Sequence, residues 1–124
     1  MHGSEIIWVK PPAKLTMAEV DRILGELEEY LRRGRPYYLL FDLGDALPDA
    51  VQRKKLTDHM RNNEDAIREW VRGLGVVVSS PLARNLMTAI LWFAPPKVPH
   101  SLFATRGAAQ AWAESLRSGQ SRVA

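Results

Sequence analysis

The spacing of hydrophobic positions changes several times along the chain. Short, mostly apolar runs lie at residues 6–9, 37–43, 76–79 and 102–105. Between these runs, apolar residues recur every three or four positions, which is the period of a helix with one buried face. The run at residues 37–43 is typical of a strand that is covered on both faces. We therefore predict strands that alternate with helices.

The first helix has clear boundary signals. Thr16 precedes it and Glu19 stands three residues later, which is the spacing of a capping box. Gly34 follows two arginines and favours the end of the helix at that point. The buried stripe of this helix is expected to comprise Val20, Ile23, Leu24, Leu27 and Leu31.

The segment that follows the second strand is the most polar part of the chain. A second helix is expected to begin near Asp49, and Asn62 and Asn63 predict a kink or a break in it. Gly73 and Gly75 are expected to lead into the third strand, which is predicted to begin at Val76. The apolar face of the segment is expected to combine Leu56, Met60, Ile67 and Trp70. A basic cluster, either a solvated helix face or a surface for an acidic partner, comprises Arg53, Lys54, Lys55 and Arg61.

A last helix is predicted after the fourth strand, and residues 118–124 are expected to form a frayed tail. The inward face of this helix is expected to contain Ala109, Trp112, Ala113 and Leu116. The alternation predicts an α/β fold with a mostly parallel sheet of four or slightly more strands and about four helices. We expect a single domain over residues 1–124, with an ordered core at about 5–117.

The helix predicted at residues 81–94 is apolar around almost its whole circumference. Its expected core stripe consists of Leu82, Leu86, Ala89, Ile90 and Phe93, and a second stripe beside it consists of Ala83, Met87, Leu91 and Ala94. A helix on one face of a sheet needs only one such stripe. Either the helix is covered by its neighbours and by residues 95–99, or its end is an exposed patch for a partner or for self-association. The candidates for that contact are Met87, Leu91, Trp92 and Phe93.

Polar residues are expected to gather at one edge of the sheet. Right-handed crossovers between parallel strands place every strand-to-helix turn at the same edge, and open α/β sheets usually bind ligands there. The polar residues predicted at this edge are Lys10, Lys14, Asp42, Asp45, Ser79, Ser80, Arg84, Thr105 and Arg106.

Two groups of these residues have both a structural and a functional interpretation. Ser80 before a proline is typical of an N-cap, and the alternative is that Ser79 and Ser80 hold an anion with help from Arg84. Phosphorylation of one serine is a variant of that alternative. Asp42 and Asp45 either close the turn after the second strand or form a metal or phosphoryl-acceptor pocket.

The composition narrows the function classes. The 124 residues carry a formal net charge of +3 from scattered Lys and Arg, so nucleic acid is not an expected partner. The absence of cysteine excludes disulfides and thiolate metal sites. His2, His59 and His100 have no metal-ligand spacing, and no catalytic set, phosphate loop or dinucleotide motif is found. We expect no catalytic residues, no metal and no cofactor, in a cytoplasmic protein without a membrane span.

Three segments carry a resemblance to a known family, namely YYLLFDL, RGLGVVVSSPLARNLMTAILWF and SLFATRGAAQAWAESL. With the order of elements over about residues 5–116, they resemble the STAS-like superfamily, in particular its SpoIIAA-like branch of anti-sigma-factor antagonists. The resemblance implies a regulatory protein-interaction module and not an enzyme. Some STAS domains are phosphorylated on a Ser or Thr that follows a strand-end aspartate. Asp42 matches that aspartate, but no Ser or Thr follows it before the helix, so the resemblance implies no such switch here.

Two functional hypotheses follow, and an enzyme is a poorer third. The first is a non-enzymatic interaction module that binds a protein partner, with a homodimer as one form of assembly. The second is a protein that binds a nucleotide, an anion or a lipid at the sheet edge around Asp42, Ser79, Ser80 and Arg84. That ligand would also use an apolar pocket under the helix at residues 81–94.

Overall fold

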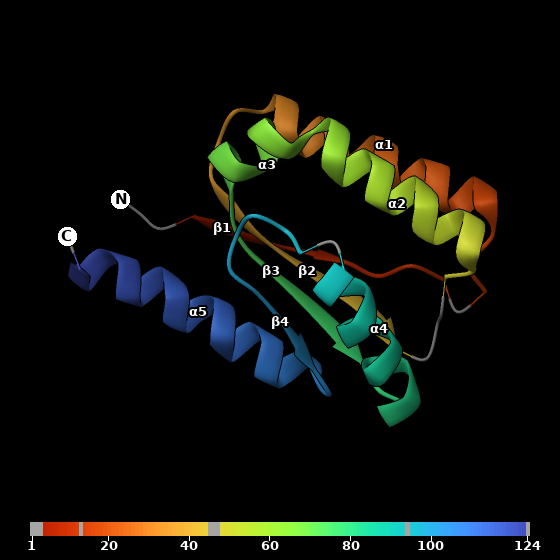
Figure 1. The fold of residues 1–124 in the computed structure, drawn as a ribbon. Coiled ribbons are helices and arrows are strands. Elements are labelled where there is room, and N and C mark those ends of the chain that lie inside the picture. The colour runs from red at the N-terminus through yellow and green to blue at the C-terminus, as the bar shows by residue number, and fades with distance from the viewer. Residues whose placement is uncertain (1–3, 13, 45–47, 94, 124) are drawn as a thin grey trace.

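The computed structural model describes residues 4–12, 14–44, 48–93 and 95–123, and their side chains except those of Ile90, Phe93 and residues 120–123. Strands and helices alternate along the chain, apart from one pair of consecutive helices (Figure 1). The elements are β1 (Glu5–Val9), α1 (Met17–Arg32), β2 (Tyr37–Gly44), α2 (Ala50–Asn62), α3 (Glu64–Trp70), β3 (Val71–Val78), α4 (Pro81–Phe93), β4 (His100–Phe103) and α5 (Arg106–Val123).

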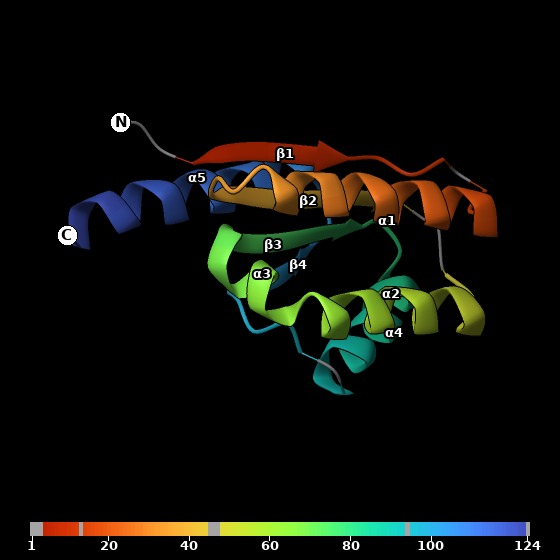
Figure 2. The ribbon, with the colours of Figure 1, turned by 90° about the horizontal axis from the view of Figure 1, so that it is seen from above.

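The four strands form one parallel sheet in the order β1-β2-β3-β4. Because each crossover advances in the same direction along the sheet, right-handed connections place α1, α2, α3 and α4 on one face. Helix α5 follows the last strand and covers the opposite face (Figure 1 and Figure 2). The α/β fold class predicted from the sequence is confirmed, and all the described strands are parallel.

Side chains along β2 alternate between two cores. Tyr37 and Leu39 belong to the core under α1, whereas Tyr38 and Leu40 belong to the core under α5. All four are buried, as expected for a strand that is covered on both faces. The predicted stripe of α1 is confirmed, because Val20, Ile23, Leu27 and Leu31 are buried and Leu24 is partly buried.

Local hydrogen bonds set the ends of the helices. Thr16 Oγ1 accepts a hydrogen bond from the backbone N–H of Glu19 at 3.1 Å, which confirms Thr16 as the N-cap of α1. The Glu19 carboxylate bonds to a neighbouring arginine, whereas a reciprocal capping box is formed by Asp49 and Gln52 at the start of α2. Gly34 follows the end of α1 with a φ of 62°, a conformation that glycine adopts without strain.

The polar segment forms two helices. Helix α2 ends at Asn62, and α3 begins at Glu64. Asn63 between them donates a hydrogen bond from Nδ2 to the backbone carbonyl of His59 at 2.9 Å. The predicted break is confirmed, and the described helices number five where about four were expected.

The third strand is longer than predicted. It begins at Val71 and not at Val76, and it includes Gly73 and Gly75. A Cβ atom added to Gly75 would lie 2.6 Å from a methyl group of Leu40 and within 3.3 Å of a ring on α5. The expectation that these glycines precede the strand is therefore wrong. Both lie within β3, where the absence of a side chain lets α5 approach the sheet closely.

The last two elements also differ from the prediction. Strand β4 lies two residues earlier than expected, because His100 pairs with Leu74 in the parallel register and Thr105 caps α5. Helix α5 extends to Val123, so most of the expected tail is helical. Its predicted inward face is confirmed, with Ala109 and Ala113 buried and with Trp112 and Leu116 partly buried in the core. Among the described helices, none has the length and hydrophobicity needed to cross a membrane.

Candidate functional site

The edge where the strands end brings together residues that lie far apart in the sequence. Asp42 is buried at the end of β2, and its Oδ2 accepts hydrogen bonds from Arg106 at 2.8 Å and from Lys10 at 3.4 Å. Burial opposes ionisation of this carboxyl group, but the two cations outweigh burial and hold the pKa of Asp42 below its usual value. Asp42 is therefore ionised at neutral pH and holds two cations at the sheet edge.

Trp8 extends this cluster from β1. The Arg106 guanidinium lies 4.0 Å from the centre of the Trp8 ring, which is a cation–π contact. The Trp8 indole Nε1 donates a hydrogen bond to Gln110 Oε1 at 2.8 Å. These contacts attach the start of α5 to β1 and β2. Trp8 and Gln110 escaped prediction because 102 positions separate them and no local pattern connects them.

The second group of candidates serves the turn between β3 and α4. Ser80 Oγ accepts a hydrogen bond from the backbone N–H three residues later at 3.3 Å, which favours the N-cap interpretation. The Arg84 guanidinium donates to the carbonyl of Ser79 at 3.2 Å and to the carbonyl of Val78 at 2.9 Å. Within the part of the chain that the structure describes, no hydrogen bond or ion pair joins these three candidates to Asp42.

The structure describes two of the three remaining candidates for the sheet edge. Lys14 is exposed. Thr105 Oγ1 accepts a hydrogen bond from the backbone N–H of Ala108 at 3.2 Å and caps α5. Asp45 lies outside the described residues, so the pocket suggested for Asp42 and Asp45 stays a prediction.

The two apolar stripes of α4 have the opposite roles to those expected. Ala83 is buried against Val76 and Val78, whereas Leu82 and Leu86 are exposed by 74% and 38%. The expected core stripe is therefore wrong for the leucines, and Ala89 is exposed as well. Because 100° of rotation separates neighbouring residues of a helix, the packing of Ala83 on Val76 and Val78 turns Leu82 away from the sheet. The side chains of the other two members, Ile90 and Phe93, lie outside the described residues.

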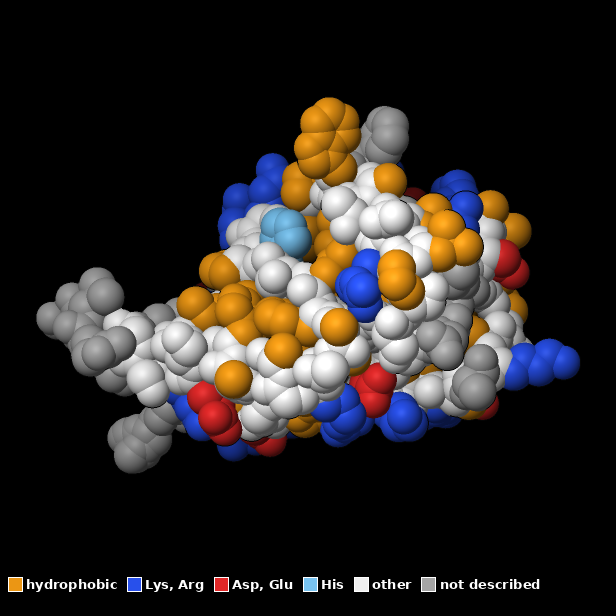
Figure 3. Space-filling model, turned by 90° about the horizontal axis from the view of Figure 1, so that it is seen from below, with side chains coloured by type: hydrophobic (Ala, Val, Ile, Leu, Met, Phe, Trp, Pro, Cys, Tyr) orange, Lys and Arg blue, Asp and Glu red, His pale blue; other side chains and the backbone are white. Residues whose placement is uncertain are grey.

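The residues predicted to contact a partner are divided by this rotation. Met87 and Leu91 are partly buried and line a cavity on the sheet side of α4. Trp92 is 82% exposed, and Figure 3 shows apolar side chains that project from this part of the molecule into solvent. We define the α4 outer face as Leu82, Leu86, Ala89 and Trp92.

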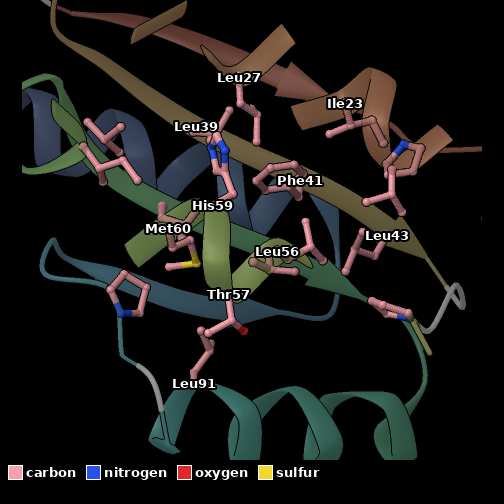
Figure 4. Close-up of a pocket in the computed structure, with 18 of the residues that line it drawn as sticks. Ile23, Leu27, Leu39, Phe41, Leu43, Leu56, Thr57, His59, Met60 and Leu91 are labelled. Carbon is pink, nitrogen blue, oxygen red and sulfur yellow. The ribbon is translucent and has the colours of Figure 1, made fainter. Parts of the chain in front are cut away.

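The cavity has a volume of about 170 Å³ and lies between the sheet and helices α1, α2 and α4 (Figure 4). Apolar side chains from the sheet and from each of these three helices surround it, among them Leu27, Leu39, Phe41, Leu56 and Leu91. An apolar pocket under this helix was expected. However, Asp42, Ser79, Ser80 and Arg84 are not among the described residues that line it.

His59 is the buried imidazole beside this cavity. Figure 4 shows its ring on α2 next to Leu27 and Leu39. Its Nδ1 lies 3.3 Å from Asn63 Nδ2 and 3.7 Å from the Glu28 carboxylate. Burial lowers the pKa of His59, and Glu28 opposes this shift only in part. The ring is therefore mainly neutral at neutral pH.

Comparisons of the chain with protein-family models, with curated proteins and with solved structures found no significant match. Within the described ranges, no group of three or more His, Cys, Asp or Glu side chains is placed to hold a metal ion. The features available for recognition are the cluster around Asp42, the α4 outer face and the apolar cavity.

Proposed function

We propose that this protein is a non-enzymatic interaction module that self-associates through the α4 outer face. The observation that carries the proposal is the exposure of Leu82, Leu86 and Trp92 on one helix. Large apolar side chains that gather on a surface mark contact sites in soluble proteins. Tryptophan is also enriched in the centres of interfaces.

A second copy of the chain is the partner that this surface fits best. Arg84 is the only charged residue of α4, and its guanidinium is bound to backbone carbonyls. The outer face therefore offers apolar contacts and no charge to attract an acidic or basic partner. Two copies related by a twofold axis would place identical apolar faces against each other.

The size of the surface is compatible with this assembly. Two leucines and a tryptophan supply roughly 400 Å² of apolar area, about half of the ~800 Å² that each partner buries in a standard interface. Residues that flank α4 would supply the remainder. The resemblance to STAS-like domains supports the same role, because those domains dock on partner proteins.

Ligand binding at the sheet edge has less support. Asp42 is already occupied by Lys10 and Arg106, and Arg84 is occupied by backbone carbonyls. An anion at that edge would have to compete with these internal contacts.

The test is the solution mass of the full chain by light scattering over a range of concentrations. We expect a dimer, and we expect L82D combined with W92D to produce a folded monomer. V51D is the matched control, because Val51 is 61% exposed on α2 and lies outside the α4 outer face. A parent protein that stays monomeric at all concentrations, or a dimer that survives the double substitution, would contradict the proposal.

A further inference from the structure

The apolar cavity matches a small organic molecule in size. Its volume of about 170 Å³ is slightly larger than the roughly 150 Å³ of an engineered cavity that stays dry and binds benzene. A ligand whose apolar body has about six to eight carbon atoms would fill such a space. The cavity is thus too small for the whole of a long lipid chain.

The few polar side chains along the cavity are mostly engaged within the protein. Arg53 donates from Nη1 to the carbonyl of Pro48 at 2.9 Å, and Thr57 donates from Oγ1 to the carbonyl of Arg53 at 2.9 Å. His59 contacts Asn63 and is mainly neutral. The remaining lining is almost entirely aliphatic or aromatic, so it favours an uncharged apolar group.

The cavity adjoins a second hollow that has a different character. Thr57, Met60, Ile67 and Pro96 line both spaces. The hollow has a volume of about 360 Å³, and its other lining residues are Arg61, Glu64, Pro95 and Lys97.

Charge at this hollow favours an anion. Arg61 and Lys97 supply two positive charges there, against one negative charge from Glu64. Both cations are exposed. Asp58 lies 3.8 Å from Arg61, but its carboxylate is bonded more closely to Lys54 at 2.8 Å. Because the hollow adjoins an apolar cavity, a single molecule with an apolar body and an anionic head can use both.

We propose that this protein binds a small monocarboxylate whose apolar body of about six to eight carbons occupies the cavity. Its carboxylate lies in the hollow beside Arg61 and Lys97. The body enters between α2 and α4, where Thr57 and Leu91 point toward one another (Figure 4). This inference does not rest on self-association, because Leu82 and Trp92 are not among the residues that line either space.

The experiment is an NMR titration of the full chain with octanoate and, separately, with the uncharged octanamide. The two probes share the apolar chain and differ in the charge of the head. We expect saturable shifts at the backbone amides of Thr57, Met60 and Leu91 with both probes. Octanoate should bind at least about threefold more tightly, which is the size of effect that exposed ion pairs produce.

Substitutions separate the two parts of the site. R61Q combined with K97Q should remove the preference for octanoate and leave octanamide binding unchanged, whereas K14Q removes an exposed lysine elsewhere and should change neither. L91W, which fills the cavity, should weaken both probes. Equal affinities of the parent protein for the two probes would overturn the anionic head, and no saturable shift with either would overturn the site. Neither of these two outcomes depends on whether a variant folds.

Discussion

The two faces of the sheet are covered in different ways. On one face, the single helix α5 packs directly on the strands, with Ala109 and Ala113 fully buried and with glycines of β3 opposite the ring of Trp112. On the other face, four helices share the cover and leave a cavity of about 170 Å³ between the sheet and α1, α2 and α4. One helix with small residues can approach a flat surface closely, whereas several helices at different rotations leave space between them.

The difference suggests a division of roles between the faces. The α5 face carries the long-range contacts of Trp8, Asp42 and Arg106, which connect β1, β2 and α5. The opposite face carries both the cavity and the exposed residues of α4. We therefore expect the α5 face to be the stable part of the molecule and the α4 side to tolerate change, and three predictions test this comparison.

The largest expected effect comes from removing a core leucine on each face. Leu40 is fully buried under α5, and L40A should lower the free energy of unfolding by about 3 to 4 kcal/mol, because it creates a cavity in a filled core. Leu91 is only partly buried beside a space that already exists, and L91A should cost about 1 kcal/mol. Urea unfolding followed by circular dichroism measures both. Similar losses would mean that the two faces are packed alike.

An intermediate effect is expected from adding volume at the close contact between β3 and α5. G75V should destabilise the protein by about 2 to 3 kcal/mol, because its side chain would overlap with Leu40 and press on Trp112. Gly25 in α1 has no neighbour within 4 Å of an added Cβ atom. G25A should therefore stabilise the protein by about 0.5 to 1 kcal/mol through its helix propensity. A neutral result for G75V in thermal unfolding would show that α5 can move away from the sheet at little cost.

The smallest expected effect concerns the buried imidazole on the cavity face. Burial lowers the pKa of His59 in the folded protein, so below about pH 6.5 the unfolded chain takes up this proton before the folded chain does. Stability should therefore fall as the pH drops through 6.5, and this dependence should stop below the folded pKa. Among the described side chains, Glu28 and Asn63 are the polar groups beside the ring. H59Q should reduce the dependence between pH 7.5 and 5.5, whereas H100Q, which removes an exposed imidazole, should preserve it.

Several elements could be predicted because their signals are local. Thr16 caps α1 through a backbone N–H three residues away, and Gly34 ends the helix by its own conformation. Asn63 breaks the polar helix through a hydrogen bond to a carbonyl four residues earlier. Each contact spans less than two helical turns, so its residues appear together in the sequence. The alternation of strands and helices is likewise a property of short windows.

The errors in α4 and β3 have the same physical cause, because both depend on contacts between elements that are distant in the sequence. In α4, both apolar stripes fit a helix equally well, and only the packing of Ala83 on Val76 and Val78 decides which stripe is buried. The glycines of β3 resemble strand breakers until Trp112 of α5 is placed against them.

The amino-acid sequence by itself determined the fold class, most helix ends and the positions from which polar residues reach the sheet edge, because these depend on local hydrogen bonds and on periodicity. Only the tertiary structure decided how α4 is rotated, that Arg106 reaches Asp42 across 64 positions, and that a cavity remains beside a hollow with two cations. These features arise from the meeting of surfaces that are distant in the chain. Their geometry is set by the packing of whole elements and not by any short run of residues.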